Sequence, residues 1–374
     1  MMIRKRRGPV LVLVLILLLA FLSACGGAKP VSAPAQGGEA SGKPITITGA
    51  GATFPYPLYS KWFYVYSTQV DPTVRFNYQS IGSGGGIRQI MAKTVDFGAS
   101  DAILTEEEKA AAPDLRMFPT VAGGVVVAYN LTDAGGKPVG KGLKLTPQAL
   151  AGIFLGTITR WNDPAIAQVN PDIALPDAEI AVAHRSDGSG TTFLFTSYLA
   201  QVSPEWREKV GAGKAVNWPV GIGGKGNEGV AGVLRQQPNS IGYIELAYAV
   251  QNHIPYAALQ NREGNFVEPS LDSIVAASNA YAGEMPDDLG QLLVNAPGKD
   301  SYPIAGYTFI LLYQDMPNCL KASKIHDFMV WALTEGDGYA RELLYAPLGE
   351  QGEKKVIAKL NTLTCEGGKP LPGK

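Results

Sequence analysis

Residues 45–54, ITITGAGATF, join a short strand pattern to a glycine-rich turn that ends in a threonine and an aromatic residue. The first four positions alternate between apolar and polar side chains, which is typical of a half-buried strand. Apolar residues at helical spacing follow over residues 58–69, with Leu58, Trp62 and Val65 on one face. The stretch therefore predicts a strand that passes through a tight turn directly into an amphipathic helix.

The same order of elements recurs further along the chain. Residues 74–80 alternate as a strand, GSGGG stands at residues 82–86, and a helix is expected over residues 87–93. VDFGASD at residues 95–101 is a short apolar strand that ends on a carboxylate. This order of strand, turn, helix and strand is the repeating unit of an open α/β sheet, whose ligands bind beyond the carboxyl ends of the strands. We therefore expect an α/β fold.

The chain length of 374 residues is enough for about two domains. An apolar strand behind a glycine pair is expected at residues 123–130, where it is a candidate crossover between two lobes. The α/β pattern continues through the middle of the chain, and a further apolar strand and two helices follow towards the C-terminus. These segments are, in chain order, residues 147–155, 180–184, 192–199, 241–250, 308–313, 325–333 and 338–344.

Three glycine-rich turns with hydroxyl side chains each lead into a predicted helix. They are residues 49–54 (GAGATF), 82–86 (GSGGG) and 187–192 (DGSGTT). The first N–H groups of a helix have no partner within it and carry partial positive charge, so that such a turn can bind an anion. Arg185 adds a fork of five donors suited to tetrahedral oxyanions, and Asp187 stands where it can fix that fork. Together these features predict an oxyanion-binding protein.

Each of these features also has a purely structural interpretation. The first turn can be a tight strand-to-helix connection, Ser83 can be an N-cap alone, and Arg185 with Asp187 can be a surface ion pair. Asp101 can cap the end of its strand. As a ligand group, however, Asp101 would accept the proton that hydrogen phosphate still carries, and it would repel a fully ionised oxyanion such as sulfate or molybdate. The carboxylate therefore favours phosphate over those anions.

Composition and motifs argue against catalysis and against nucleic-acid binding. The net charge of −1 lacks the basic excess of nucleic-acid-binding proteins. GASDA at residues 98–102 lacks the final glycine of a nucleophile elbow, and none of His184, His253 and His326 stands in a catalytic motif. The sequence has no Walker A loop, HExxH or CxxC motif. We expect no enzymatic activity, no cofactor and no metal site; a secreted hydrolase is the alternative.

The first residues have the form of an export signal. Basic residues precede an apolar run at residues 10–22, which is too short to span a bilayer. LSAC at residues 22–25 resembles a bacterial lipobox, so residues 1–24 are expected to be removed and Cys25 to be acylated. Residues 25–43, rich in Gly, Ala, Ser and Pro, are expected to form a flexible tether. We predict a lipid-anchored protein on the extracytoplasmic face of the cell membrane; an ordinary signal peptide with an incidental cysteine is the alternative.

Two further cysteines remain in the mature chain, Cys319 and Cys365. An even number of cysteines in an oxidising compartment predicts a disulfide. The bond would close a loop of about 46 residues and stabilise the fold by roughly 4 kcal/mol in the chain-entropy description. The alternative is a pair of buried free thiols.

Several segments resemble the substrate-binding proteins of the bacterial high-affinity phosphate ABC transporter (Pst). They are TITGAGATFP at residues 46–55, TVDFGASD at residues 94–101, RSDGSGT at residues 185–191, NWPVG at residues 217–221, GGKGN at residues 223–227 and SIGY at residues 240–243. The resemblance extends over nearly all of residues 45–350 and is specific.

The resemblance implies a type II periplasmic-binding-protein fold, in which two open α/β lobes joined by hinge strands close on the anion. Residues 45–122 and 300–374 would form lobe I, and residues 123–299 would form lobe II. Its partners would be inorganic phosphate, the inner-membrane permease that receives it and the ATPase of that permease. The protein itself is expected to be a monomer.

The resemblance also implies a set of ligand groups. Lobe I would supply Thr53, the backbone N–H of Phe54, Ser83 and Asp101, and lobe II would supply Arg185, Ser189, Gly190 and Thr191, with Asp187 as a supporting ion-pair partner. His184 stands where a basic residue is common in the family, and the second turn has one serine where the family has two.

Overall fold

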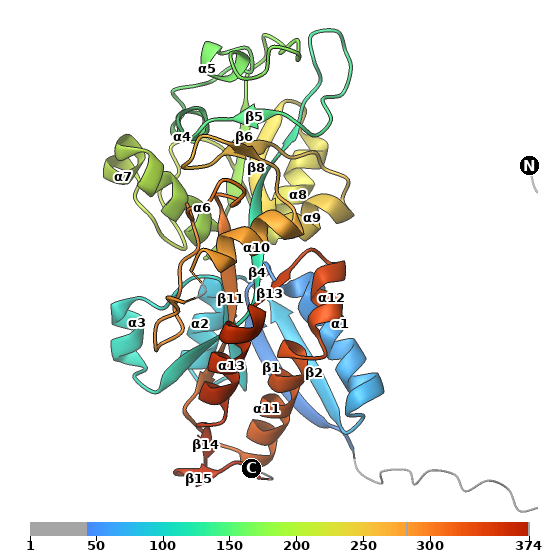
Figure 1. The fold of residues 1–374 in the computed structure, drawn as a ribbon, viewed down its shortest axis with the longest axis vertical. Helices are drawn as coiled ribbons and strands as arrows, with labels where there is room; N and C mark the ends of the chain where they lie inside the picture. Colours follow the sequence, from blue (N-terminus) through green and yellow to red (C-terminus); the bar gives the residue numbers. More distant parts are fainter. Residues whose placement is uncertain (1–42, 282, 373–374) are drawn as a thin grey trace, which may run out of the picture. The chain divides into compact units, whose positions relative to one another are not determined.

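Strand β4 (Leu115–Asn130) takes part in both lobes of the computed structural model, which describes residues 43–281 and 283–372. Its first part pairs antiparallel with β11 (Ala305–Tyr313), up to the pairing of Gly124 with Ala305. Its second part pairs antiparallel with β8 (Ser240–Glu245), beginning at the pairing of Val125 with Glu245. Figure 1 shows β4 and β11 running from the lower group of elements into the upper group. One continuous strand therefore links the two lobes.

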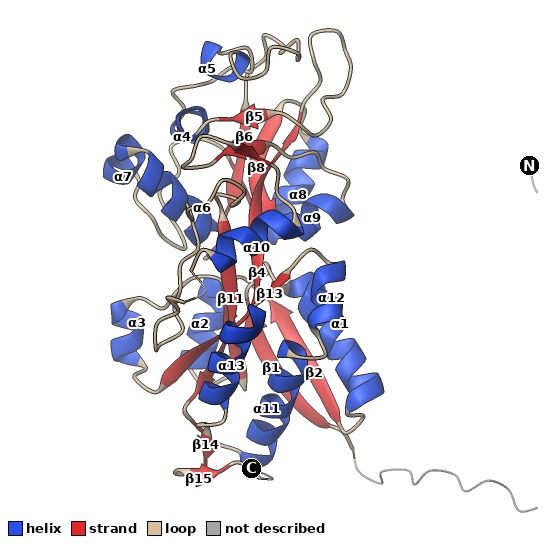
Figure 2. Cartoon of the chain, viewed as in Figure 1, coloured by secondary structure: helices blue, strands red, loops and turns tan. Residues whose placement is uncertain are grey.

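Lobe I is built on the strand order β2-β1-β3-β11-β4, with the short β13 (Ala346–Pro347) paired to β4. Its strands β1 (Ile45–Gly51), β2 (Val74–Ser80) and β3 (Phe97–Ser100) are parallel to one another. Helices surround this half of the sheet (Figure 2). They are α1 (Tyr56–Val65), the π-helix η1 (Tyr66–Val70), α2 (Ser83–Met91), α3 (Glu106–Ala111), α11 (Cys319–Leu333), α12 (Asp337–Glu342) and α13 (Gly349–Leu360).

Lobe II continues the sheet in the order β4-β8-β6-β7. Strand β6 (Ala181–Arg185) pairs parallel with β8, and β7 (Ile222–Gly224) pairs parallel with β6. A second, three-stranded sheet consists of β5 (Lys144–Leu145), β9 (Ala258–Gln260) and β10 (Phe266–Val267). The helices of this part are α4 (Pro147–Leu155), α5 (Pro164–Ala167), α6 (Gly190–Val202), α7 (Pro204–Lys209), α8 (Gly226–Gln236), α9 (Leu246–Gln251) and α10 (Leu271–Asn279).

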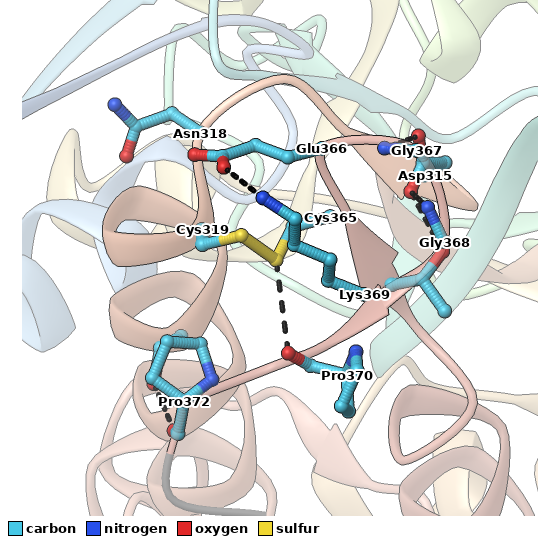
Figure 3. Close-up of a disulfide and its surroundings, with 12 residues drawn as sticks. Asp315, Asn318, Cys319, Cys365, Glu366, Gly367, Gly368, Lys369, Pro370 and Pro372 are labelled. Carbon is cyan, nitrogen blue, oxygen red and sulfur yellow. Dashed lines mark hydrogen bonds and ion pairs between the residues drawn. A yellow bond between two sulfur atoms is a disulfide. The ribbon is translucent and has the colours of Figure 1, made fainter.

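The C-terminal segment is joined to α11 by a disulfide between Cys319 and Cys365, whose Cα atoms lie 5.0 Å apart (Figure 3). Cys365 belongs to a small sheet of β12 (Asp315–Met316), β14 (Thr364–Cys365) and β15 (Lys369–Pro370). Its side chain is fully buried. The bond therefore fastens the first residue of α11 to a segment that has little sheet structure of its own.

Aromatic side chains fill the core on both sides of the crossover. In lobe I, the ring centroid of Phe76 lies 4.6 Å from those of Phe63 and Phe328, which joins β2 to α1 and α11. In lobe II, Phe195 of α6 stacks on Tyr243 of β8 at 4.3 Å. Such pairs add about 0.5–1.5 kcal/mol each beyond the burial of their area. They fix α1 and α11 against β2 in lobe I and α6 against β8 in lobe II.

The two-lobed α/β fold predicted from the sequence is confirmed, with differences at element ends. The second helix begins at Ser83, before the expected residues 87–93, and its N-cap is Gly82 with a φ of 86°. The alternative interpretation of Ser83 as an N-cap is therefore wrong: Gly82 holds that position, in a backbone conformation that glycine takes readily. The first helix ends at Val65 and continues as the π-helix.

The predicted signal peptide, Cys25 and residues 25–42 of the predicted tether lie outside the described residues. Within residues 43–281 and 283–372, no helix combines the length and apolar character needed to cross a bilayer.

Candidate anion-binding site

The second and third glycine-rich turns touch each other across the two lobes. The N–H of Gly84 donates to the carbonyl of Gly188 at 2.9 Å, and the N–H of Gly190 donates to Ser83 Oγ at 3.0 Å. A β-carbon on Gly190 would lie 2.5 Å from Asp101 Oδ2 and 2.6 Å from Ser83 Oγ. The N-termini of α2 and α6 therefore meet at a point that tolerates no side chain at position 190.

Asp101 follows the last residue of β3 and is almost fully buried. Its Oδ1 accepts a hydrogen bond from Thr308 Oγ1 of β11 at 2.7 Å, and Ser83 Oγ donates to its Oδ2 at 3.4 Å. Burial raises the pKa of Asp101 to about 7, although the hydrogen bond from Thr308 and the charge of Arg185 act in the opposite direction. Asp101 therefore does not cap its own strand, and its partner Thr308 was not among the expected site residues.

Arg185 ends β6 and forms a buried ion pair with Asp187. Its Nε donates to Asp187 Oδ1 at 2.8 Å, and its Nη2 donates to Oδ2 at 2.5 Å. The side chains are 1% and 13% exposed, so this is no surface ion pair. Burial opposes ionisation of Asp187, but the hydrogen bonds and charge of Arg185 hold the pKa of the carboxyl below its ordinary value. The remaining edge of the guanidinium, at Nη1, donates to Thr191 Oγ1 at 3.3 Å.

Thr53 and Thr191 are linked by Asn227, in the first turn of α8. Asn227 Nδ2 donates to Thr53 Oγ1 at 2.9 Å and to Thr191 Oγ1 at 3.2 Å. The carbonyl of Thr53 accepts from the Tyr248 hydroxyl at 2.6 Å. Asn227 and Tyr248 were not among the expected site residues, although Asn227 ends the GGKGN segment.

Four backbone donors of the expected site have no protein acceptor. Thr53, Phe54, Ser83 and Thr191 are buried, and no group of the described residues accepts a hydrogen bond from their backbone N–H groups. Phe54 is held through its carbonyl, which accepts from the Tyr345 hydroxyl at 2.7 Å. Ser189 caps α6, because its hydroxyl accepts from the N–H of Thr192 at 3.0 Å. Buried N–H groups without a protein acceptor are rare and mark places where another acceptor is bound.

An ion pair between the lobes flanks the two turns. Lys214 Nζ lies 2.8 Å from both carboxylate oxygens of Glu108, in α3. The carbonyl of Lys214 also accepts from the N–H of Ser189 at 2.8 Å. Both side chains are about four-fifths buried. Lys214, whose carbonyl binds the N–H of Ser189 in lobe II, is thus joined to α3 of lobe I.

The candidate catalytic groups do not form a catalytic arrangement. Ser100 Oγ donates to the carbonyl of Ala102 at 2.7 Å, and no imidazole is among its hydrogen-bond partners in the described part of the chain. His184 stacks on Trp218 at 4.8 Å, and its Nδ1 lies 3.0 Å from the carbonyl of Arg185, so its ring serves packing in lobe II. Over residues 43–281 and 283–372, no group of three or more His, Cys, Asp or Glu side chains could hold a metal ion.

A second buried carboxyl, Glu245, lies at the end of β8 and was missed in the sequence. Its backbone N–H donates to Asn227 Oδ1 at 3.0 Å, and its side chain is fully buried. Burial raises the pKa of Glu245 to about 8. The sequence does contain a signal for this residue: Glu245 is a carboxylate at the end of an apolar segment, as Asp101 is.

Comparison with known proteins agrees with this geometry. Residues 33–335 match the family model described as the PBP superfamily domain. The chain is 49% identical to the phosphate-binding protein PstS of Pasteurella multocida over 329 residues, covering 87% of this chain and 93% of that protein. It is also 49% identical to PstS of Haemophilus influenzae over 305 residues, which covers 81% and 89% of the two chains.

A solved phosphate-binding protein from Stenotrophomonas maltophilia has the same fold. The TM-score is 0.62 at 19% identity, and the match covers 84% of this chain and 93% of that one. The sequence and fold comparisons agree with each other: this chain belongs to the PstS family of phosphate-binding proteins, within the PBP superfamily.

Proposed function

We propose that this protein binds inorganic phosphate, as hydrogen phosphate, between lobes I and II and delivers it to a phosphate ABC permease with its ATPase. The observation that carries the proposal is the set of buried N–H donors without a protein acceptor, at Thr53, Phe54, Ser83 and Thr191, together with the oriented guanidinium of Arg185. Charge-assisted hydrogen bonds of this kind are strong and suit a tetrahedral oxyanion. The naming of the relatives as phosphate-binding proteins supports the choice of anion.

In this proposal the two lobes contribute different groups to one anion. Lobe I provides Thr53, Phe54, Ser83 and Asp101, and lobe II provides Arg185, Ser189, Gly190 and Thr191. Arg185 and the backbone N–H groups donate to the phosphate oxygens. Asp101 accepts the remaining proton of hydrogen phosphate, which sulfate does not carry at neutral pH.

Closure of the lobes completes the set of ligand groups. We assign residues 45–122 and 300–374 to lobe I and residues 123–299 to lobe II. The change of partner along β4, from β11 to β8, supports a hinge between Gly124 and Val125. Contacts such as Ser83 with Gly190 and Glu108 with Lys214 form only when the lobes are together, so they stabilise the closed form.

The cellular setting follows from the first residues of the sequence. In the proposal Cys25 carries a lipid that anchors a monomer to the extracytoplasmic face of the membrane, near the permease. The protein is a carrier and catalyses no reaction; the relatives are transport binding proteins, which supports this.

Isothermal titration calorimetry of the purified protein with phosphate, sulfate and molybdate tests the function, with a phosphatase assay of the same preparation. We expect saturable binding of phosphate at one site per chain, far weaker binding of the other two anions, and no turnover. Equal affinity for sulfate, or hydrolysis of a phosphate monoester, would contradict the proposal.

A further inference from the structure

Glu245 and Tyr345 form a contact between the lobes beside the candidate anion site. Glu245 Oε2 lies 2.9 Å from the hydroxyl oxygen of Tyr345. Glu245 ends β8 of lobe II, whereas Tyr345 directly precedes β13, which pairs with the lobe I part of β4. Both side chains are fully buried. Because Glu245 pairs with Val125, the contact lies at the point where β4 passes from one lobe to the other.

The hydrogen atoms of this contact can be counted. The Tyr345 hydroxyl lies 2.7 Å from the carbonyl of Phe54 and 2.9 Å from Glu245 Oε2. A phenol has one proton to donate, and a backbone carbonyl can only accept. The shorter contact takes the tyrosine proton, so the contact with Glu245 needs a second proton, and Glu245 is the group that can carry it.

The other contacts of Glu245 fit a neutral carboxyl. Its Oε2 accepts from the N–H of Ala247 at 2.9 Å, which a carboxylic acid hydroxyl oxygen can do. Its Oε1 has no hydrogen-bond partner among the described residues. An ionised carboxylate in this position would leave a charged oxygen buried without a donor. The free energy of burying such a charged oxygen is well above that of burying a neutral carbonyl oxygen.

The surroundings of Glu245 supply no compensating cation. Arg185, at the end of β6, is paired with Asp187, and none of the ion pairs in the described residues includes Glu245. Asp101 adds a repulsive charge to the effect of burial. The elements packed on β8 carry few other titratable groups: His184 on β6, Glu228 and Arg235 on α8, Tyr248 on α9, Tyr198 on α6, and Arg116 and Tyr129 on β4.

We propose that Glu245 is protonated in the closed form, donates this proton to the Tyr345 hydroxyl, and acquires it when the lobes close on phosphate. The inference rests on the proposed function. Glu245 is then a positioning residue: through Tyr345 it holds the carbonyl of Phe54, whose N–H faces the anion, and through its own N–H it holds Asn227. The pKa of about 8 that burial gives Glu245 agrees with the proton count.

The proposal fixes the sign of a pH dependence. When the lobes separate, water reaches the carboxyl and its pKa falls towards the ordinary 4.5. Between 4.5 and about 8, closure therefore binds a proton that the open form lacks. Phosphate affinity should fall as pH rises through this window, by up to about tenfold per pH unit from this group, and should level off above it.

The number of protons taken up with phosphate tests the proposal. Calorimetry near neutral pH in two buffers of different ionisation enthalpy gives this number for the parent protein and for Glu245→Gln. We expect the parent to take up close to one proton more than the variant; the contributions of phosphate and Asp101 cancel in the difference. Glu228→Gln, which alters an exposed carboxylate on the neighbouring helix α8, should behave like the parent. Equal uptake by parent and Glu245→Gln would overturn the inference.

Infrared spectroscopy of the phosphate-saturated protein provides a second readout. The parent should show the band of a protonated carboxyl group that Glu245→Gln lacks. In Tyr345→Phe the band should remain but shift, because the carboxyl loses its acceptor; this variant decides the matter if Glu245→Gln does not fold. A parent without the band, or an unshifted band in Tyr345→Phe, would overturn the inference. A parent that binds no phosphate would instead refute the proposed function.

Discussion

Asp187 holds the guanidinium of Arg185 along one edge, with two parallel hydrogen bonds of 2.8 and 2.5 Å. This arrangement fixes the plane of the guanidinium and leaves the edge at Nη1 directed towards Thr191, at the N-terminus of α6. A bidentate pair of this kind gives direction as well as charge. The donor set for an anion is therefore oriented before any anion arrives.

Arg185 should contribute more to phosphate affinity than any other single side chain. Arg185→Ala should raise the dissociation constant at least about tenfold, because charge-assisted hydrogen bonds are worth about 1.5–3 kcal/mol. Arg185→Lys should recover part of the loss, since lysine keeps the charge but cannot pair with Asp187 along two bonds. Calorimetric titration measures both variants. Binding by Arg185→Ala within about twofold of the parent would show that the assigned site is wrong.

Gly190→Ala should block closure of the lobes. The added methyl group would lie 2.5 Å from Asp101 Oδ2 and 2.6 Å from Ser83 Oγ, both in lobe I. We expect phosphate affinity to fall at least about tenfold, a change of about 1.4 kcal/mol. Gly232→Ala, on α8, is the matched control, because a β-carbon there meets no atom within 4 Å. Loss of affinity in both variants, or in neither, would contradict the role of Gly190.

Selectivity against sulfate should depend on the ionisation of Asp101. Above its pKa of about 7 the carboxylate can accept the proton of hydrogen phosphate but meets sulfate with an unpaired negative charge. We expect a preference for phosphate of several orders of magnitude there, since an unmatched buried acceptor costs roughly 1–3 kcal/mol and repulsion adds to it. Below that pKa a protonated Asp101 can donate to sulfate, and the preference should narrow. Asp101→Asn should keep some phosphate affinity and lose part of the discrimination and its pH dependence.

Competition titrations of both anions at several pH values, with parent and Asp101→Asn, decide this prediction. The ratio of phosphate to sulfate affinity should fall as the pH is lowered in the parent and change less in Asp101→Asn. An equal ratio in the two proteins at every pH would contradict the role of Asp101.

Removal of the disulfide should lower stability without affecting binding. The double variant Cys319→Ser/Cys365→Ser should lose about 4 kcal/mol of unfolding free energy, from a loop of 46 residues. Its phosphate affinity should not change, because β14 and β15 lie at the end of lobe I remote from α6 (Figure 1). Denaturant unfolding and calorimetry measure the two quantities. Stability equal to that of the parent would show that the bond constrains little of the unfolded chain.

Cys25→Ser should abolish lipidation in cells that produce the full sequence. The precursor should remain uncleaved, or the product should appear in a soluble fraction, because the acylated thiol is absent. Detergent partitioning and the mass of the N-terminal peptide provide the measurement. Unchanged partitioning of the variant would contradict the lipid anchor.

Local sequence patterns were sufficient to predict the strands and helices around the three turns. Strand β2 occupies residues 74–80 as expected, and β6 and α6 flank the third turn as expected. The start of α2 was misplaced, because a run of glycines normally disfavours a helix. Close packing explains why a glycine stands in this helix: a β-carbon on Gly86 would lie 2.5–2.7 Å from backbone atoms of β1 and β3.

The groups behind the site could not be predicted from local pattern. Thr308, Tyr248 and Tyr345 lie far along the chain from the site residues that they contact. Each stands in an apolar segment, and such a segment predicts only a buried strand or helix. Glu245 stands in the same kind of segment. Its partner in lobe I is 100 residues away, so only the folded chain brings the two together.

The strand order also sets the sequence of events when the molecule first folds. Strand β11 lies between β3 and β4 in the sheet, yet it is the last of these three to be synthesised. Until residues 305–313 have emerged, β1, β2 and β3 have no connection to β4 in the sheet. Strands β8, β6 and β7 have all their neighbours by residue 245. The sheet of lobe II can thus form before the C-terminal part of the chain has been synthesised, whereas β1, β2 and β3 must stay unaggregated until β11 follows.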